Sequence, residues 1–291
     1  MNFLSAFING LSSGGTYAII ALGYTMVYGI AKMLNFAHGD VIMVGGYAMF
    51  VTLLAVGQPL VALAAALVFC VILGVTIERF AYRPLRGASP LAVLITAIGV
   101  SFLLQSLAQI LFGSASKMLL PLQITGSLSL GSLTIDYSTI VTLSVTVVIM
   151  VMLSLFVKYS KTGRAMVAVS EDRDAAILMG VNTNGIIAIT FAIGSALAAV
   201  AGYLMLCKAP SLSNTLGAMP GIKAFTAAVI GGIGSIPGAM LGGILLGVVE
   251  SLSYSIPELA PFTDAVEFSI LILVLLIRPS GILGKKRREK V

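Results

Sequence analysis

Few residues of this chain could do chemistry. It has one histidine, His38, and two cysteines, Cys70 and Cys207, that form no metal-binding or redox motif. The glycine-rich stretch GGIGSIPG is followed by Ala239 and Met240, not by the Lys-Ser/Thr pair of a phosphate-binding loop. We therefore predict that the chain is not an enzyme and that it holds neither a metal nor a cofactor of its own.

Carboxylates are also scarce in the apolar segments. Glu250 and Glu267 lie within or near the last of these segments, and Glu78 begins a basic loop. A carrier driven by protons or sodium is expected to place carboxylates or histidines in mid-membrane. The pattern weighs against such a carrier.

The segment GIAKMLNFAHGDVIMVGG (29–46) is the most polar interruption of the early apolar region. Transporters often place substrate contacts where helices are broken near the membrane centre, so Asn35 and His38 are candidates for the translocation pathway. The alternative is an interfacial turn in which Asp40 caps the second span. The pattern leaves both interpretations open.

A second interruption, IGGIGSIPGAMLGG, divides the apolar region 223–256. Backbone groups freed by Gly and Pro must be buried against protein or water, because lipid cannot bond them. The region is either two short spans or one re-entrant hairpin. Its residues Gly231, Gly232, Gly234 and Ser235 are further pathway candidates.

The longest hydrophilic stretch is 158–185. Its periodicity predicts an amphipathic helix over 164–180 that places Ala165, Val169, Ala176 and Met179 on one face. Gly180 would end this helix, and a turn with Asn182 and Asn184 would lead into the next span. The pattern fits a helix that docks on a partner, and it fits a solvated loop helix equally well.

These segments lie in a chain whose composition requires a membrane. It is 58% hydrophobic and 10% charged, with a mean hydropathy of +1.08, whereas soluble domains carry about 25% charged residues. The apolar segments lie at 3–30, 40–57, 59–78, 91–112, 138–157, 186–207, 223–236, 238–256 and 265–278. We predict an all-α integral membrane protein, a polytopic bundle of about 8–9 transmembrane helices that forms one domain over 1–291. Glycines four residues apart, such as Gly10/Gly14 and Gly243/Gly247, predict close helix packing.

Basic residues predict the orientation. Of 17 Lys and Arg residues, 13 fall in three clusters beside apolar segments. The clusters are Arg79/Arg83/Arg86, Lys158/Lys161/Arg164/Arg173 and Arg278/Lys285/Lys286/Arg287/Arg288/Lys290. This is the positive-inside pattern, not a face for nucleic acid. It puts 158–185 and the C-terminus in the cytoplasm, the N-terminus outside if every segment crosses, and 113–137 outside as a hairpin.

Four motifs in order resemble one family of transport proteins. They are NGLSSGGTYAIIALGYTMVYGI, MLNFAHGD with a following GGY, GRAMVAVSEDRDAAILMGVN, and GGIGSIPGAMLGG with the later RPSGILG. Together they span nearly the whole chain. The chain resembles the branched-chain amino acid permeases of the LivH type, which are membrane subunits of ATP-binding-cassette importers.

The resemblance implies a permease of the bacterial inner membrane that moves branched-chain amino acids by alternating access. It implies a heterodimer with a second homologous permease subunit, two ATP-binding subunits that bind the ATP, and a periplasmic substrate-binding protein. The loop 158–185 would couple the permease to an ATPase. Its coupling residues would be Arg164, Glu171, Ala175, Ala176 and Gly180. Alternatives are a related permease for urea or short-chain amides, and an ATP-independent channel or secondary carrier.

Overall fold

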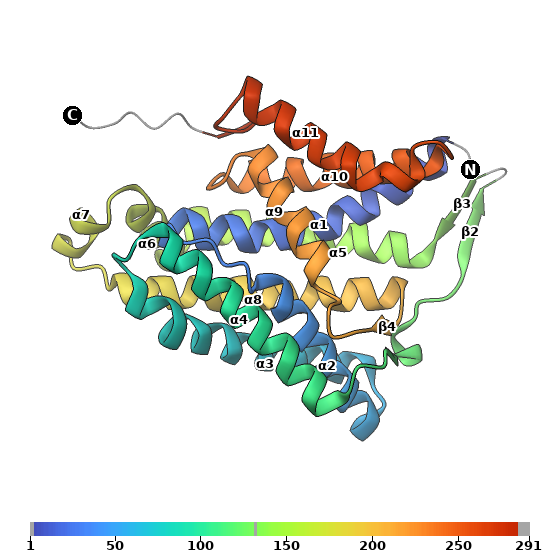
Figure 1. Cartoon of the computed structure of the whole chain (residues 1–291), viewed down its shortest axis with the longest axis horizontal. Helices are drawn as coiled ribbons and strands as arrows, with labels where there is room; N and C mark the ends of the chain where they lie inside the picture. The colour runs from blue at the N-terminus through green and yellow to red at the C-terminus, as the bar shows by residue number, and fades with distance from the viewer. Residues whose placement is uncertain (1–2, 131–132, 285–291) are drawn as a thin grey trace.

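The computed structural model describes residues 3–130 and 133–284 of the chain, which are almost entirely helical. Within these residues eight helices are long and apolar enough to cross a membrane. The long helices are α1 (Phe3–Ala31), α2 (His38–Val56), α3 (Pro59–Ile77), α4 (Pro90–Phe112), α5 (Tyr137–Tyr159), α8 (Thr183–Lys208), α10 (Ile236–Ser255) and α11 (Thr263–Ile277). The predicted polytopic helical bundle is confirmed (Figure 1).

Shorter elements lie between the long helices. They are the π-helical turn η1 (Glu78–Tyr82), the 3₁₀ turns η2 (Arg83–Leu85), η3 (Leu120–Leu122) and η4 (Ala260–Phe262), the helices α6 (Lys161–Glu171), α7 (Arg173–Leu178) and α9 (Ala218–Gly231), and the strands β1 (Lys117–Met118), β2 (Ser127–Leu130), β3 (Leu133–Asp136) and β4 (Ser211–Leu212). Strand β1 pairs antiparallel with β4, and β2 pairs antiparallel with β3.

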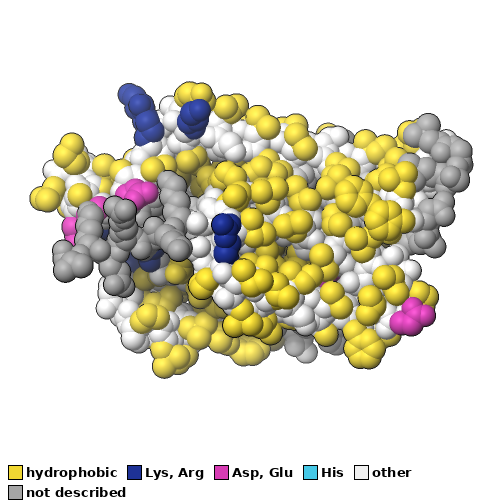
Figure 2. Space-filling model, turned by 90° about the horizontal axis from the view of Figure 1, so that it is seen from above, with side chains coloured by type: hydrophobic (Ala, Val, Ile, Leu, Met, Phe, Trp, Pro, Cys, Tyr) yellow, Lys and Arg dark blue, Asp and Glu magenta, His cyan; other side chains and the backbone are white. Residues whose placement is uncertain are grey.

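The bundle has two distinct ends. Strands β2 and β3 form the hairpin predicted within 113–137, beside the start of α1, and we call this the hairpin end. Helices α6 and α7 lie at the opposite end, which we call the α6–α7 end (Figure 1). Apolar side chains cover the middle of the surface, and the visible Lys and Arg side chains lie in the half that belongs to the α6–α7 end (Figure 2). This distribution is the one expected for a bundle surrounded by lipid.

Helix α1 is the centre of the bundle. Most of its residues are buried, and it packs mainly against α10 and α8. The contact with α10 uses the predicted glycines: a Cβ at Gly247 would overlap the backbone of Gly14, and one at Gly10 would lie 2.8 Å from the Cα atom of Val248. Close backbone approach through small residues is the usual means of helix association in lipid. The prediction of close packing is confirmed.

The region 223–256 contains two helices, and the break between them is shorter than predicted. Only residues 232–235 are non-helical, and Pro237 and Gly238 already belong to the first turn of α10. Proline is tolerated there because the first helical N–H groups have no partner within the helix. Helix α9 has 14 residues, a length of about 21 Å, which is less than the roughly 30 Å of a hydrocarbon core.

We predict opposite effects for one methyl group at two helical glycines. Gly247→Ala should destabilise the fold by about 1–3 kcal/mol, since its Cβ would meet the α1 backbone. A Cβ at Gly99 in α4 would have nothing within 4 Å. Gly99→Ala should therefore be neutral or stabilising, because Ala favours a helix. Thermal unfolding in detergent, followed by circular dichroism, measures both. Equal midpoints for the two variants would contradict the role given to this contact.

Candidate functional site

An irregular segment, residues 32–37, joins α1 to α2 and carries the first pathway candidates. Asn35 is 4% exposed, and His38, the first residue of α2, is 1% exposed. The backbone N–H of His38 donates to the Asn35 carbonyl at 3.1 Å. The Tyr82 hydroxyl from η1 donates to Asn35 Oδ1 at 2.9 Å. The segment is therefore held inside the bundle, as irregular backbone at membrane depth must be.

The His38 ring is tightly enclosed. It packs edge-on against Tyr24 with the ring centroids 4.8 Å apart. Gly23 makes room for the ring, since a Cβ there would overlap Nε2, and Nε2 has no hydrogen-bond partner within the described residues. The position of His38 thus depends on two neighbouring residues of α1.

The prediction that Asp40 caps α2 is wrong. The residue before the helix is Ala37, which makes no side-chain cap, and Asp40 lies inside the first turn. Its carboxylate instead accepts a hydrogen bond from Gln105 Nε2 of α4 at 2.8 Å, and it is 2% exposed. The carboxylate joins two spans, a contact that local sequence does not indicate.

The glycine-rich break carries the second group of pathway candidates. It packs against the last described residues of the chain. The backbone N–H groups of Ile282 and Leu283 donate to the carbonyls of Ile230 and Gly231 at 2.8 and 2.9 Å. Gly232 has φ +107°, and a Cβ there would lie 2.7 Å from the Cα atom of Gly284. The segments GGIG and RPSGILG therefore form one packed unit.

The remaining two candidates of the break have different surroundings. Ser235 caps α10 by accepting from the Gly238 N–H at 3.2 Å, and Gly234 lies against Gly29 of α1. Packing explains all four residues of this group. Their place in the pathway stays a prediction.

The two groups of candidates lie on different parts of α1. His38 packs on Gly23, whereas Gly234 packs on Gly29, six residues further along the helix. No hydrogen bond or ring contact found among the described residues joins Asn35 or His38 to the glycine-rich break. The structure brings each group together internally, and the groups are connected through α1 and through α9, whose Phe225 packs on Phe36.

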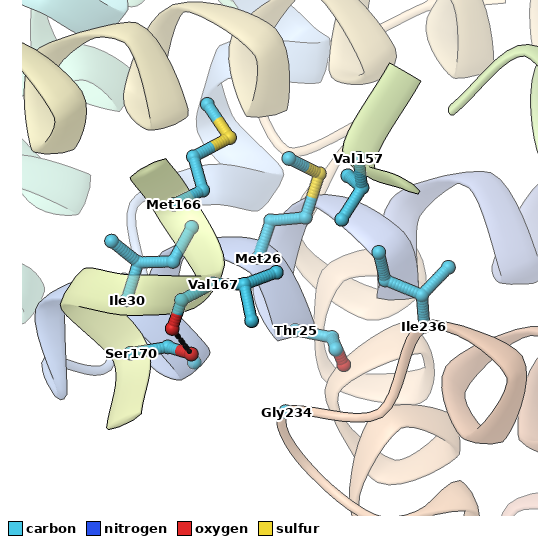
Figure 3. A pocket seen from close by; sticks show the side chains of 10 residues that line it. Thr25, Met26, Ile30, Val157, Met166, Val167, Ser170, Gly234 and Ile236 are labelled. Carbon is cyan, nitrogen blue, oxygen red and sulfur yellow. Dashed lines mark hydrogen bonds between the residues drawn. The ribbon is translucent and has the colours of Figure 1, made fainter. Parts of the chain in front are cut away.

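A small cavity lies between α1, α6 and the glycine-rich break. Residues of all three line it, and Figure 3 shows Met26 and Ile30 of α1, Met166 and Ser170 of α6, and Gly234 around it. Its volume is about 70 Å³, whereas sites for small molecules usually have at least about 300 Å³. The cavity has room for a little water but not for an amino acid.

The predicted coupling helix is two helices. Asp172 interrupts it with extended backbone, and its carboxylate caps α7 by accepting from the N–H groups of Asp174 and Ala175. Asp is among the strongest N-cap residues, so this single side chain starts a new helix. The break also changes the predicted face, since Met179 is 84% exposed while Val169 and Ala176 are buried.

The predicted coupling residues lie on the outside of this loop, apart from one. Arg164, Glu171 and Ala175 are exposed, whereas Ala176 is 4% exposed. Gly180 is exposed with φ +80°, and nothing lies within 4 Å of its Cβ position. The predicted turn after it is confirmed for Asn182, which caps α8 through the Gly185 N–H at 3.1 Å, but not for Asn184, which already belongs to the first turn of α8.

Sequence reasoning missed a buried ion network near the hairpin end. Lys223 of α9 lies 2.6 Å from Glu250 of α10, and 2.9 and 3.2 Å from Asp264 and Glu267 of α11. The Tyr17 hydroxyl of α1 donates to the same Glu250 oxygen at 3.0 Å. Lys223 in an apolar segment was the available signal, because an unpaired buried ammonium is too costly to persist.

A second buried ion pair lies at the α6–α7 end. Arg86 pairs with Glu78, and both side chains are less than 10% exposed. Arg86 also donates to the Asn184 side chain at the start of α8. Burial lowers the pKa of the Arg86 guanidinium, and the neighbouring Glu78 carboxylate partly offsets this effect. Both groups were visible in sequence, but their pairing was not predicted.

Comparison with known proteins places this architecture in a family. The family described as "Branched-chain amino acid transport system / permease component" matches residues 6–275. The chain belongs to this family.

Individual relatives agree over almost the full length of the permease. It is 48% identical to the high-affinity branched-chain amino acid transport system permease protein BraD of Pseudomonas aeruginosa, covering 100% of this chain and 98% of the relative. It is 45% identical to LivH of Escherichia coli K12, with 99% and 98% covered. A solved structure, PsaBC from Streptococcus pneumoniae in complex with Fab, has a TM-score of 0.50 at 15% identity, over 96% of this chain and 93% of that one. This last likeness concerns the fold alone.

We predict that Lys223→Met strongly destabilises the permease. The substitution leaves buried carboxylates of α10 and α11 without their cation, a loss that typically costs about 3–5 kcal/mol. The triple variant Lys223→Met/Glu250→Gln/Glu267→Gln should recover most of this stability, because it removes the buried charges together. Lys208→Met, at an exposed lysine, is the control. Thermal unfolding in detergent compares them, and a triple variant no more stable than Lys223→Met would contradict the electrostatic explanation.

Proposed function

We propose that this chain is the membrane-spanning subunit of an ATP-driven importer for branched-chain amino acids in a bacterial inner membrane. The observation that carries the proposal is full-length similarity of 45–48% to permeases named for that transport. The chain itself is non-catalytic in this proposal. The ATP is bound by two separate ATP-binding subunits, and a periplasmic binding protein delivers the substrate.

The α6–α7 loop supports the proposed docking of an ATP-binding subunit. Leu178 and Met179, at the end of α7, are 87% and 84% exposed. Ala176 beneath them is buried, and it accepts a hydrogen bond from the Val181 backbone N–H at 3.0 Å. Two large apolar side chains project from an anchored turn. Their exposure to water is unfavourable, and a groove on a partner protein would bury them. We place this end, and the C-terminus, in the cytoplasm because the basic clusters adjoin it.

The volume of the small cavity limits where the substrate can pass. Its volume of about 70 Å³ cannot hold leucine, isoleucine or valine, and the larger cavity of about 270 Å³ between α5 and Met240 of α10 has an almost wholly apolar lining that does not suit the charged head of an amino acid. We therefore place the passage at the interface with a second homologous permease subunit. In this arrangement the irregular segments 32–37 and 232–235 stabilise the wall of the passage, and Asn35 and His38, which are buried, reach the substrate only when the wall moves.

Reconstitution tests the proposed function directly. Proteoliposomes would contain this permease, a second permease subunit and two ATP-binding subunits, with the binding protein outside. We expect uptake of labelled leucine that requires ATP and all components, and competition by isoleucine and valine but not by urea. Competition by urea would favour an amide permease, and flux through this chain alone without ATP would contradict the proposal.

A substitution at Gly180 tests the coupling loop. Gly180→Arg should lower uptake per ATP hydrolysed by tenfold or more while the protein stays folded in the membrane, because the open space around Gly180 would be filled by a side chain at the docking surface. Gly57→Arg is the matched control: it also has positive φ and open space, but it ends α2 at the other side of the bundle. Uptake and ATP hydrolysis are measured together. Equal ratios of uptake to ATP hydrolysis in the two variants would show that Gly180 does not belong to the docking surface.

A further inference from the structure

The end of α3 departs from regular helix at a point where three structural units meet. Residues Glu78–Tyr82 form the π-helical turn η1, and the Arg83 backbone N–H donates to the Glu78 carbonyl five residues back. Such turns are rare and are often found at functional sites, because each one loosens the local ladder of hydrogen bonds. Both side chains at the limits of the turn are buried, with Glu78 2% and Tyr82 1% exposed.

Tyr82 connects the turn to the irregular segment 32–37. Its hydroxyl donates to Asn35 Oδ1 at 2.9 Å and lies 3.4 Å from the Leu34 carbonyl. Its ring packs against Phe191 of α8 with the centroids 5.3 Å apart. The turn thus holds the segment that carries Asn35 and that leads directly into His38, the first residue of α2.

Arg86 connects the same turn to the α6–α7 loop. One nitrogen of its guanidinium pairs with Glu78, and the other donates to the side chain of Asn184. Asn184 is the second residue of α8. It follows the end of the α6–α7 loop, where Gly180 has a positive φ and Asn182 caps α8. The two-pronged guanidinium can hold both partners at once, which a lysine ammonium does less well.

These contacts form one continuous series, and we propose that it couples the α6–α7 loop to the segment that carries the pathway candidates. The series is Asn184, Arg86, Glu78, Tyr82 and Asn35, and we call it the π-turn relay. The proposal rests on the proposed function, in which an ATP-binding subunit pushes on α6 and α7. When docking moves the start of α8, Asn184 displaces Arg86. The turn η1 then rotates, and the Tyr82 hydroxyl moves the Asn35 side chain.

The composition of the relay favours coupling over simple packing. A buried ion pair generally stabilises a fold no more than apolar residues of the same volume, so stability alone gives little reason for the pair of Arg86 and Glu78. Its members come from η1, the loop that follows it, the start of α8 and the segment after α1. The step from Glu78 to Tyr82 runs through the backbone of η1. The other steps are directional hydrogen bonds or ion pairs, so rotation of one element changes the next in a defined direction.

Variants that leave the fold intact can test the relay. Tyr82→Phe removes only the hydroxyl and keeps the ring on Phe191. Asn184→Ala removes the acceptor of Arg86 at an exposed helical position where Ala is a good helix former. Tyr47→Phe is the matched control, because Tyr47 is also buried and its hydroxyl has no hydrogen-bond partner within the described residues. All are measured in the complete reconstituted transporter with labelled leucine.

The readout is leucine taken up per ATP hydrolysed, with thermal stability recorded beside it. Tyr82→Phe and Asn184→Ala should each lower this ratio by roughly three- to tenfold, the usual range for coupling through a network, while Tyr47→Phe leaves it unchanged. The double variant Tyr82→Phe/Asn184→Ala should lose no more than the more affected single variant, because both interrupt one series.

Three results would decide against the relay. Unchanged ratios in Tyr82→Phe and Asn184→Ala would overturn it, even if stability fell, since the contacts would then be structural only. Losses that multiply in the double variant would show two independent effects and would overturn the shared route. A native transporter with no ATP-dependent uptake would overturn the proposed function itself, and the relay with it, so the two failures are distinguishable.

Discussion

The close approach of α1 to α10 is the contact on which the other irregular parts of this bundle depend. Glycines on both helices allow backbone atoms to touch, as at Gly14 and Gly247. This contact fixes α1 in the centre of the bundle. Because α1 is fixed, Gly23 and Gly29 present two positions where non-helical segments can pack. In lipid an irregular segment must be covered on all sides by protein, so a loosely held α1 would leave one side of each region uncovered.

The glycine-rich break illustrates how the chain meets this requirement. The last carbonyls of α9 have no partner within the helix, and the N–H groups of Ile282 and Leu283 supply partners for two of the last residues. The positive φ of Gly232 and its contact with Gly284 bring the two segments together. Two stretches of sequence about fifty residues apart are thus one structural unit.

Much of the architecture could be predicted from sequence because it depends on local properties. Apolar length identified the spans, glycine spacing identified helices that pack closely but not which helices meet, and Asn182 was placed correctly in the turn before α8. The break at Asp172 was predictable in principle, since Asp is a strong N-cap, but the helical periodicity on both sides of it concealed the signal. The assignment of Asp40 as a cap failed for a different reason: its partner, Gln105, belongs to another span.

The candidate site was harder to predict because charges find partners far away in sequence. Lys223 pairs with residues on two later helices, and Arg86 reaches back to Glu78 and forward to Asn184. No pattern in a single window shows such a pairing. Sequence analysis therefore gave the scarcity of charge correctly and its arrangement incompletely.

The arrangement of charge has a consequence for the proposed transport. Lys223 lies toward the hairpin end within 3.2 Å of three carboxylates, and Arg86 pairs with Glu78 at the α6–α7 end, so each of these two cations already has a carboxylate partner. Between the two ends lie the Asn35 amide, the His38 ring and the Asp40 carboxylate, which is buried against Gln105. A zwitterionic amino acid would be held by any isolated charge along its route, because opposite charges attract strongly in surroundings of low dielectric. A wall whose cations are paired at its ends, and whose intervening Asp40 carboxylate is buried against Gln105, favours rapid release over tight binding, and it leaves selection to a protein that meets the substrate first.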